Sequence, residues 1–369
     1  MTSIPSKQNV ELGTRIVSLD LLRIIACFLV ILLHVSAEYV VKIEDCPSTF
    51  LLNKWQIGNI YNALTRSAVP LFVMISGAFM LDPNRAVTNE KIKNKFFKLV
   101  QIYLFWSVIY LIFHAFGRYI QKGNLEGYTS IGVIVMKILA GSYHMWFFYL
   151  LGGLYILVPL FRVITKESKL MHYFLVLSFL VTFFIPNLQL LPSFIVISTI
   201  TDQFDFQMVK GYSFYFVFGY FLKNYFRTKA ISKKILYTVI TSFILAWSIT
   251  VYGQWVININ RTSLVEAFYN NFFITTMIEA FTLFVISLYL NQTFSFRGNR
   301  ISKLASYTMG MYLLHALVLS TMSELFFFSN WTLNAFVAIP LVTVAVFLIC
   351  WFGINIMTKI PFIGKFCYW

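Results

Sequence analysis

The residue pair best suited to chemistry is Arg23 and His34, which lie eleven residues apart in one apolar segment, 16–36. In a helix, eleven steps return the chain to within roughly 20° of the same direction, after about 16 Å of rise. A guanidinium group and an imidazole then share one helix face. Because burying an arginine in a membrane costs at least about 2.5 kcal/mol, the pair is a candidate functional site. The structural alternative is that Asp20 neutralises Arg23 and that His34 reaches the far interface.

The composition places this helix in a lipid bilayer. Of the 369 residues, 59% are hydrophobic and only 12% are charged, against about 25% charged in soluble domains. The four cysteines are scattered without a CxxC pair, which favours neither a disulfide framework nor a metal site. The first apolar run is too long for a signal peptide and ends without a cleavage site, so it predicts a retained helix.

Apolar stretches of about 20 residues recur along the whole chain. They predict an all-α polytopic membrane protein of about ten transmembrane helices, with a cytoplasmic tail at 1–15, a membrane domain at 16–358 and a second cytoplasmic tail at 359–369. The expected spans are 16–36, 63–81, 97–117, 145–161, 171–190, 211–226, 235–256, 268–290, 304–328 and 333–358. The stretch 187–210, which contains Pro192, is too short to span and is expected to be re-entrant or interfacial.

The distribution of charge predicts the orientation. With the N-terminus in the cytoplasm, most of the 29 Lys and Arg residues fall in cytoplasmic segments, as the positive-inside rule requires. Both chain ends are then cytoplasmic. The net charge of +15 therefore indicates membrane topology and attraction to anionic lipid, and gives no support for nucleic acid as a partner. Arg23 lies toward the cytoplasm and His34 farther out.

The second predicted span carries Arg66 at its outer end, followed by Pro70, Ser76 and Gly77. The small residues Ser76 and Gly77 would let another helix backbone approach closely. Arg66 is either a functional cation or an interfacial residue whose charged end reaches the membrane surface.

Three further polar residues are candidates because of their positions. His315 lies in the middle of a span, so it must find a partner inside the bundle. His144 precedes Trp146 at a helix entrance, where an interfacial aromatic belt is the alternative interpretation. Glu279 is the acidic residue placed deepest in a span. It is either protonated or paired with a cation such as Arg66 or Arg23.

These residue types fit one membrane chemistry. A neutral imidazole can take the proton from a sugar hydroxyl as that hydroxyl attacks a thioester, and an arginine can stabilise phosphate or oxyanion charge. The lysines at the start of the third span could hold the phosphates of coenzyme A at the cytosolic entrance: Lys91, Lys93, Lys95 and Lys98. The alternative is an ordinary positive-inside cluster.

The sequence resembles the acyltransferase-3 family of bacterial membrane acyltransferases, and within it the branch of the enterobacterial common antigen O-acetyltransferase. The matching segments follow in family order: SLDLLRIIACFLVILLH, VPLFVMISGAFML, YHMWFFYLLGGLYILVPL, YFVFGYFL and SYTMGMYLLHALVL. The resemblance implies ten helices, a bacterial inner or plasma membrane, and acyl-CoA-dependent O-acylation of cell-envelope glycans.

The resemblance also assigns roles to residues. It implies that Arg23 and His34 are important, with His34 as the base. It matches four supporting positions, Arg66, His144, Trp146 and His315. The chain departs from the family where the third span begins with lysines instead of arginine, since lysine cannot form a bidentate contact with phosphate. It also has no SGNH-type domain after the last helix.

The predicted function is therefore a membrane O-acyltransferase, with acetyl as the expected group. Acetyl-CoA is the expected co-substrate, and a lipid-linked or surface glycan is the expected acceptor. The protein is expected to contact membrane lipids and to have no permanently bound cofactor. The alternative is a proton-coupled transporter or flippase, which visible half-sequence symmetry would favour. A glycan polymerase would need a large outer loop. Cys27 and Tyr312 are interpreted as packing residues in preference to acyl carriers.

Overall fold

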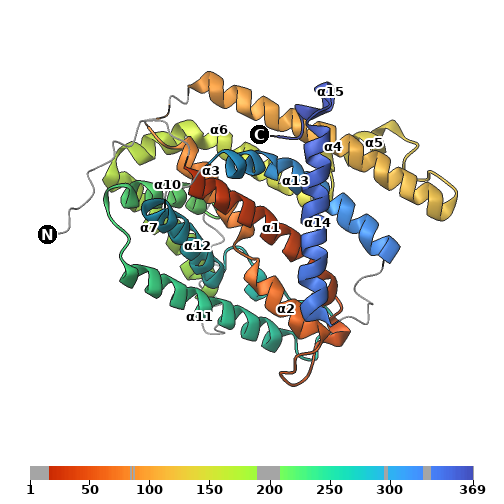
Figure 1. The fold of residues 1–369 in the computed structure, drawn as a ribbon, viewed down its shortest axis with the longest axis horizontal. Coiled ribbons are helices and arrows are strands. Elements are labelled where there is room, and N and C mark those ends of the chain that lie inside the picture. The colour runs from red at the N-terminus through yellow and green to blue at the C-terminus, as the bar shows by residue number, and fades with distance from the viewer. Residues whose placement is uncertain are drawn as a thin grey trace.

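The computed structural model describes residues 16–83, 85, 88–188, 208–294, 298–326 and 334–368, and in these ranges every regular element is a helix (Figure 1). The predicted all-α class is confirmed. The helices are α1 (Val17–Val40), α2 (Lys54–Leu64), α3 (Ala68–Met80), α4 (Asn89–Lys122), α5 (Ile131–Ala140), α6 (Trp146–Lys166), α7 (Ser168–Phe179), α8 (Ile185–Leu188), α10 (Tyr212–Thr228), α11 (Lys233–Asn258), α12 (Ile274–Thr293), α13 (Asn299–Phe326), α14 (Ala335–Met357) and α15 (Pro361–Gly364).

Within the described part, eight helical segments are long and apolar enough to cross a membrane, which supports a polytopic membrane protein. They are Val17–Val40, Lys54–Met80, Asn89–Lys122, Tyr143–Lys166, Ser168–Leu188, Lys233–Asn258, Ala267–Thr293 and Ala335–Met357. The predicted spans 211–226 and 304–328 coincide with α10 and α13. The count of ten crossings remains a prediction. Most of the stretch 187–210 lies outside the described residues.

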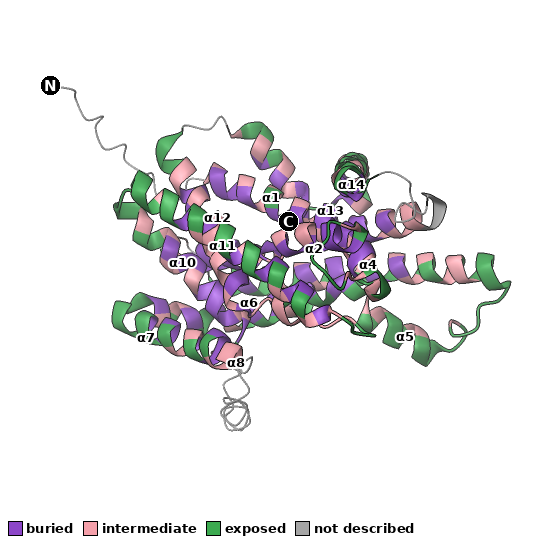
Figure 2. Ribbon diagram, turned by 90° about the horizontal axis from the view of Figure 1, so that it is seen from below, coloured by how far each residue is buried: buried purple, intermediate pink, exposed green. Residues whose placement is uncertain are grey.

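Helix α1 occupies the centre of the bundle and packs against α2, α3, α12, α13 and α14. Its residues Leu19, Ile31 and Val35 have no exposed surface. Figure 2 shows the buried residues concentrated in the interior, while α11 and α14 carry exposed residues on their outer sides. Many of these outer side chains are large and apolar, Ile244 and Phe352 among them, as expected for surfaces that contact lipid. The predicted Arg23–His34 helix is thus surrounded by the others.

The backbones of α3 and α10 touch where the sequence predicted a close approach. A Cβ atom on Gly77 would collide with the carbonyl oxygen of Phe216, and one on Gly219 would collide with that of Met74. Only glycine fits at both positions, so the small-residue interpretation of Gly77 is confirmed.

The second predicted span differs from the structure. The helix begins at Lys54 and is interrupted by a turn at 65–67, so Arg66 lies at a break between α2 and α3. Proline has no N–H to donate, and this break places Pro70 in the first turn of α3, where no intrahelical partner is needed. The expectation that Arg66 stands at the outer end of a span was therefore wrong.

Helix α5 lies between the predicted spans 97–117 and 145–161, where no span was predicted. It is ten residues long, strongly apolar and without a buried residue. Such a helix, exposed on its apolar side, is suited to the membrane interface. Its end is fixed to the bundle, because the Tyr103 hydroxyl donates to the carbonyl oxygen of Leu139 at 2.5 Å.

Candidate active site

Three histidines that are far apart in the sequence form one cluster inside the bundle. His34 comes from α1, His144 from the turn before α6, and His315 from the middle of α13. The ring of His315 lies 5.1 Å from that of His34 and 5.2 Å from that of His144, measured between centroids. His315 is fully buried and His144 is only 2% exposed. His315 was expected to need a partner inside the bundle, and it packs against the other two histidines. His144 is a buried interior residue and does not belong to an interfacial aromatic belt.

Tyrosines surround this cluster and fix the backbone near it. The Tyr312 hydroxyl donates to the carbonyl oxygen of His144, and the Tyr110 hydroxyl donates to that of Leu313 at 2.6 Å. The ring of Tyr143 packs edge-on against His34, with 5.3 Å between centroids. The three histidines are therefore held by α4, α6 and α13 as well as by α1.

The hydrogen bonding of His315 indicates its tautomer. Its Nδ1 contacts the carbonyl oxygen of Tyr312, one turn earlier on the same helix. Because a carbonyl oxygen can only accept, Nδ1 carries the proton in the neutral ring. The other nitrogen, Nε2, is buried and has no hydrogen-bond partner within the described residues. A neutral ring of this kind has a free lone pair that can accept a proton.

His34 and His144 open onto a cavity of about 440 Å³. Its other walls come from the break between α2 and α3, the start of α6, and the segment before α12. The lining residues are Val30, Leu33, His34, Arg66, Val69, His144, Trp146, Glu266, Tyr269, Asn270, Asn271 and Tyr312. This set combines imidazole, guanidinium, carboxylate, amide and indole groups, so the cavity is chemically mixed.

Arg66 is anchored within the bundle and does not extend toward the surface. Its guanidinium lies 3.7 Å from the ring centroid of Tyr269, and Nη1 donates to the carbonyl oxygen of that residue at 3.2 Å. Nη2 donates to the side-chain oxygen of Asn62. Its Nε is buried with no hydrogen-bond partner in the described part of the chain. The interfacial interpretation of Arg66 does not fit these contacts.

A second cavity, of about 470 Å³, surrounds the other end of the same face of α1. Four basic residues line it, Arg23, Arg85, Lys95 and Lys98, together with a single acidic residue, Asp20. Arg23 Nη1 lies 3.8 Å from Asp20 Oδ1, and the Ser302 hydroxyl donates to the other carboxylate oxygen at 2.7 Å. The predicted Asp20–Arg23 contact exists, but four cations face one carboxylate, so the cavity is basic.

Only some of the lysines predicted to bind acyl-CoA line the Arg23 cavity. Lys95 and Lys98 line the Arg23 cavity, whereas Lys93 is exposed and lies outside its wall. Arg85, which sequence reasoning did not single out, takes part in the wall, and its guanidinium lies 4.5 Å from the Phe79 ring centroid.

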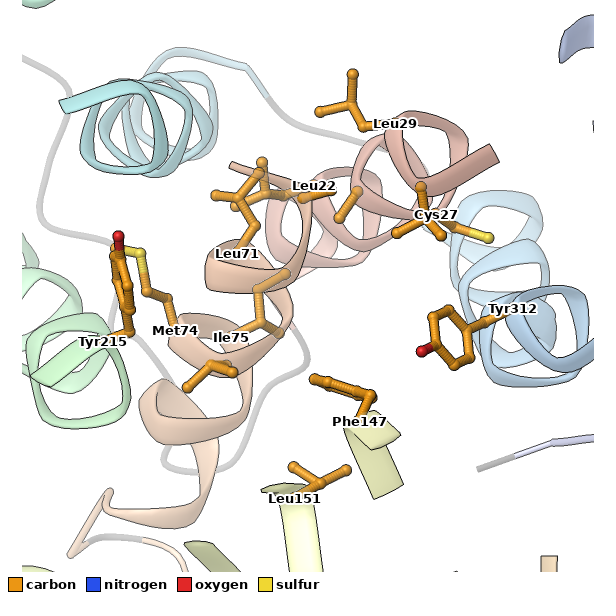
Figure 3. Packing of buried hydrophobic residues seen from close by; sticks show 14 of the residues in the cluster. Leu22, Cys27, Leu29, Leu71, Met74, Ile75, Phe147, Leu151, Tyr215 and Tyr312 are labelled. Atoms are coloured by element: carbon orange, nitrogen blue, oxygen red, sulfur yellow. The ribbon is translucent and has the colours of Figure 1, made fainter. Parts of the chain in front are cut away.

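Tyr312 lines both cavities. Its ring lies 5.7 Å from that of Phe147 and 6.5 Å from that of Phe72. Figure 3 shows Tyr312 and Phe147 pointing into the same interior space from α13 and α6. Phe72 and Phe147 belong to the wall of the Arg23 cavity, and Tyr312 lies at the boundary between that cavity and the His34 cavity.

Two other candidates lie outside both cavities. Glu279 is fully buried, and neither carboxylate oxygen has a hydrogen-bond partner among the described residues. Cys27 is also fully buried, and its thiol contacts the carbonyl oxygen of Thr308 at 3.7 Å. Cys27 therefore acts as a packing residue. No group of three or more His, Cys, Asp or Glu within the described part is arranged to hold a metal ion.

A buried histidine cluster beside a basic cavity, inside a bundle of apolar helices, marks a candidate functional site. A family model described as an acyltransferase domain matches residues 16–354. The chain therefore belongs to the acyltransferase-3 family and is a membrane acyltransferase, as the resemblance implied. No match emerged from the curated proteins or from the solved structures.

Proposed function

We propose that the chain is an O-acetyltransferase that moves an acetyl group from cytosolic acetyl-CoA to a hydroxyl of a lipid-linked or surface glycan. This proposal is supported above all by the two cavities that Tyr312 lines, one of which is basic while the other contains His34. The acetyl group, the glycan class and the bacterial inner or plasma membrane rest on the resemblance to the enterobacterial common antigen O-acetyltransferase branch.

The Arg23 cavity is the proposed binding site of the donor, acetyl-CoA. Coenzyme A carries phosphates and a soluble nucleotide, which favour a site rich in cations at the cytosolic side. Arg23, Arg85, Lys95 and Lys98 supply that charge. Arginine can bind phosphate through two parallel hydrogen bonds, whereas lysine acts as a point charge. The thioester end of the donor then points along the aromatic floor of the cavity toward Tyr312.

The chemical step is assigned to the histidine cluster. His34 takes the proton of the acceptor hydroxyl while its oxygen attacks the thioester carbonyl carbon. The new C–O bond forms, the C–S bond breaks, and the proton passes to the departing coenzyme A thiolate. Arg66 supplies positive charge for the tetrahedral oxyanion. His315, with its ring 5.1 Å from His34, fixes the ring of His34 as a positioning residue.

The His34 cavity is the proposed binding site of the acceptor, the glycan. Trp146 is 43% exposed at its wall, and an exposed indole offers an apolar face to a sugar ring. Glu266, Asn270 and Asn271 line the same cavity and offer carboxylate and amide groups to sugar hydroxyls. A few polar groups placed around an apolar face are typical of small-molecule sites.

The alternative is a proton-coupled carrier or flippase for a glycan or an acyl compound. Glu279 favours it, because a buried carboxyl group without a hydrogen-bond partner in the described residues is the type of group that proton-coupled pathways use. A carrier moves its cargo without breaking a thioester, which separates the two functions.

Inside-out vesicles containing the protein and an internal glycan acceptor provide the test. Added radiolabelled acetyl-CoA should label the lumenal glycan and release free coenzyme A outside. Vesicles with the His34→Ala variant should do neither. Glycan movement without loss of thioester would instead establish the carrier, and labelling from the lumenal side alone would reverse the proposed orientation.

The proposed orientation also has a direct test. With both ends in the cytoplasm, single cysteines introduced in 229–233 and 259–263, at opposite ends of α11 (Lys233–Asn258), should react with an impermeant reagent from opposite sides of the membrane. Reaction of both from one side would contradict the proposed topology.

A further inference from the structure

A third cavity, of about 320 Å³, lies between α4 and the segment 361–368. This segment follows the residues matched by the acyltransferase family model, 16–354. The cavity is lined by Asn94, Phe97, Lys98, Gln101, Ile102, Lys365, Phe366 and Tyr368. It is therefore built partly from residues that the family match does not include.

The segment 361–368 is packed into the bundle. Trp106 Nε1 of α4 donates to the carbonyl oxygen of Phe366 at 3.1 Å. The rings of Phe105 and Phe366 are stacked, with 4.3 Å between centroids and 9° between planes. Cys367 is fully buried against α13, where a Cβ on Gly310 would collide with its carbonyl oxygen. The wall that this segment contributes is held by two helices.

Lys98 connects this third cavity to the Arg23 cavity, because it lines both. A second ammonium group, that of Lys365, belongs to the opposite wall, and no acidic residue lines the cavity. Two partly exposed aromatic rings flank the lysines, Phe97 at 50% and Tyr368 at 42% exposure. The Lys98 ammonium lies 5.1 Å from the centre of the Tyr368 ring. Positive charge and partly exposed aromatic rings are thus combined.

This combination matches a nucleoside phosphate. Aromatic side chains stack on nucleobases, lysines bind phosphates as point charges, and the amides of Asn94 and Gln101 can exchange hydrogen bonds with base or ribose. A lipid headgroup phosphate would use the lysines but would leave the two ring faces without a role.

We propose that the third cavity binds the nucleotide part of the donor, the 3′-phosphorylated ADP group of acetyl-CoA. This inference rests on the proposed function. The adenine stacks on Tyr368 and Phe97, the 3′-phosphate contacts Lys365, and the diphosphate extends past Lys98 toward the cations of the Arg23 cavity. The segment 361–368 is then a donor-specificity element.

The test compares Lys365→Gln and Tyr368→Leu with the control Lys359→Gln, which changes an exposed lysine outside the cavity. Two donors are used, acetyl-CoA and acetyl-pantetheine, which lacks the nucleotide. Loss of one partly exposed phosphate contact should raise KM for acetyl-CoA about tenfold. KM for acetyl-pantetheine should stay unchanged in every variant, and the control should behave as wild type.

Binding of radiolabelled adenosine 3′,5′-bisphosphate to the purified protein provides a readout that does not depend on transfer. Both variants should weaken it about tenfold as well. The inference would be overturned if KM changed equally for the two donors, or if it stayed unchanged for both. It would also be overturned if the variants lost bound anionic lipid while their binding of the bisphosphate stayed unchanged. Bisphosphate binding that depends on Lys365 in a protein unable to transfer acetyl groups would overturn the proposed function and leave the nucleotide site standing.

Discussion

The two cavities along α1 differ in how their polar groups are satisfied. At the Arg23 end, charges of opposite sign meet, and the carboxylate of Asp20 also receives a hydrogen bond from Ser302. At the His34 end, imidazole rings pack against one another, and His315 Nε2 has no hydrogen-bond partner in the described residues. The first arrangement is suited to holding a charged ligand, and the second is suited to moving a proton.

The difference follows from electrostatics in a membrane protein. A cation is expensive in the bilayer interior, and in the basic cavity the carboxylate of Asp20 offsets part of the positive charge. A neutral imidazole carries no such cost and can lie in the middle of the bundle, as His315 does. The chain therefore gathers four cations at one end of this helix face and places the histidines, with Arg66 and Glu266, at the other, with Tyr312 lining both cavities.

Replacing His34 should lower the rate of acetyl transfer more than any other substitution proposed for the two cavities. His34→Ala removes the proposed base, and general bases contribute roughly 10²- to 10⁴-fold to rate. We expect acetyl transfer to fall by about that factor, measured with radiolabelled acetyl-CoA at equal amounts of membrane-inserted protein. The control is His172→Ala, which removes an exposed imidazole on α7 that contacts Ser168. Near-normal transfer by His34→Ala would make His315 the better base candidate.

Arg23→Ala should have the next largest effect and should act on the donor alone. Hydrogen bonds to charged groups are worth about 1.5–3 kcal/mol, so kcat/KM for acetyl-CoA should fall by about 10- to 100-fold. KM for the glycan should remain unchanged. The control is Arg261→Ala, an exposed arginine in the loop after α11. A change in the glycan KM as large as that in the donor KM would show that the two cavities are not separate sites.

Much of the fold and part of this site could be predicted from the sequence. Apolar stretches of about 20 residues predicted every long helix, and the eleven-residue spacing of Arg23 and His34 predicted their shared face, because both signals are local in the chain. Family resemblance predicted the acyltransferase class, which the match over 16–354 confirms. Residue type and depth predicted that His315 needs a partner inside the bundle.

The remaining features depend on contacts between distant segments. The His34–His144–His315 cluster joins α1, α13 and the turn before α6, and Tyr269 approaches Arg66 from 203 positions away in the sequence. No local pattern encodes such contacts. Two signals were nevertheless available. Tyr312 lies three residues before His315, and Pro70 indicated an interruption in the second span.

Trp146→Leu should produce a smaller change, and on the acceptor side. Loss of an aromatic contact of about 0.5–1.5 kcal/mol corresponds to a two- to twelvefold rise in KM for the glycan. KM for acetyl-CoA should not change. The control is Trp351→Leu, an equally exposed indole on α14 that lines neither cavity. A donor-side defect in Trp146→Leu would remove Trp146 from the proposed acceptor site.

Tyr312→Phe should give the smallest change in rate, and its comparison with Tyr312→Ala tests how Tyr312 limits passage between the two cavities. Tyr312→Phe keeps the ring and loses one hydrogen bond to the backbone of His144, so we expect a loss of about 1 kcal/mol in the free energy of unfolding and up to about fivefold in transfer. Tyr307→Phe is the control, since Tyr307 is a buried tyrosine of α13 that lines neither cavity.

Tyr312→Ala removes the ring at the boundary of the two cavities and widens their connection, so water from the His34 side should reach the thioester even without a glycan in place. We expect acetyl-CoA hydrolysis without glycan to rise relative to transfer, measured as free thiol released per acetylated glycan formed. In Tyr312→Phe this ratio should stay at the wild-type value, because the ring is still present. A ratio that is unchanged in both variants would show that Tyr312 does not separate the two cavities. A ratio raised equally in both would assign the effect to the hydroxyl group and the position of His144.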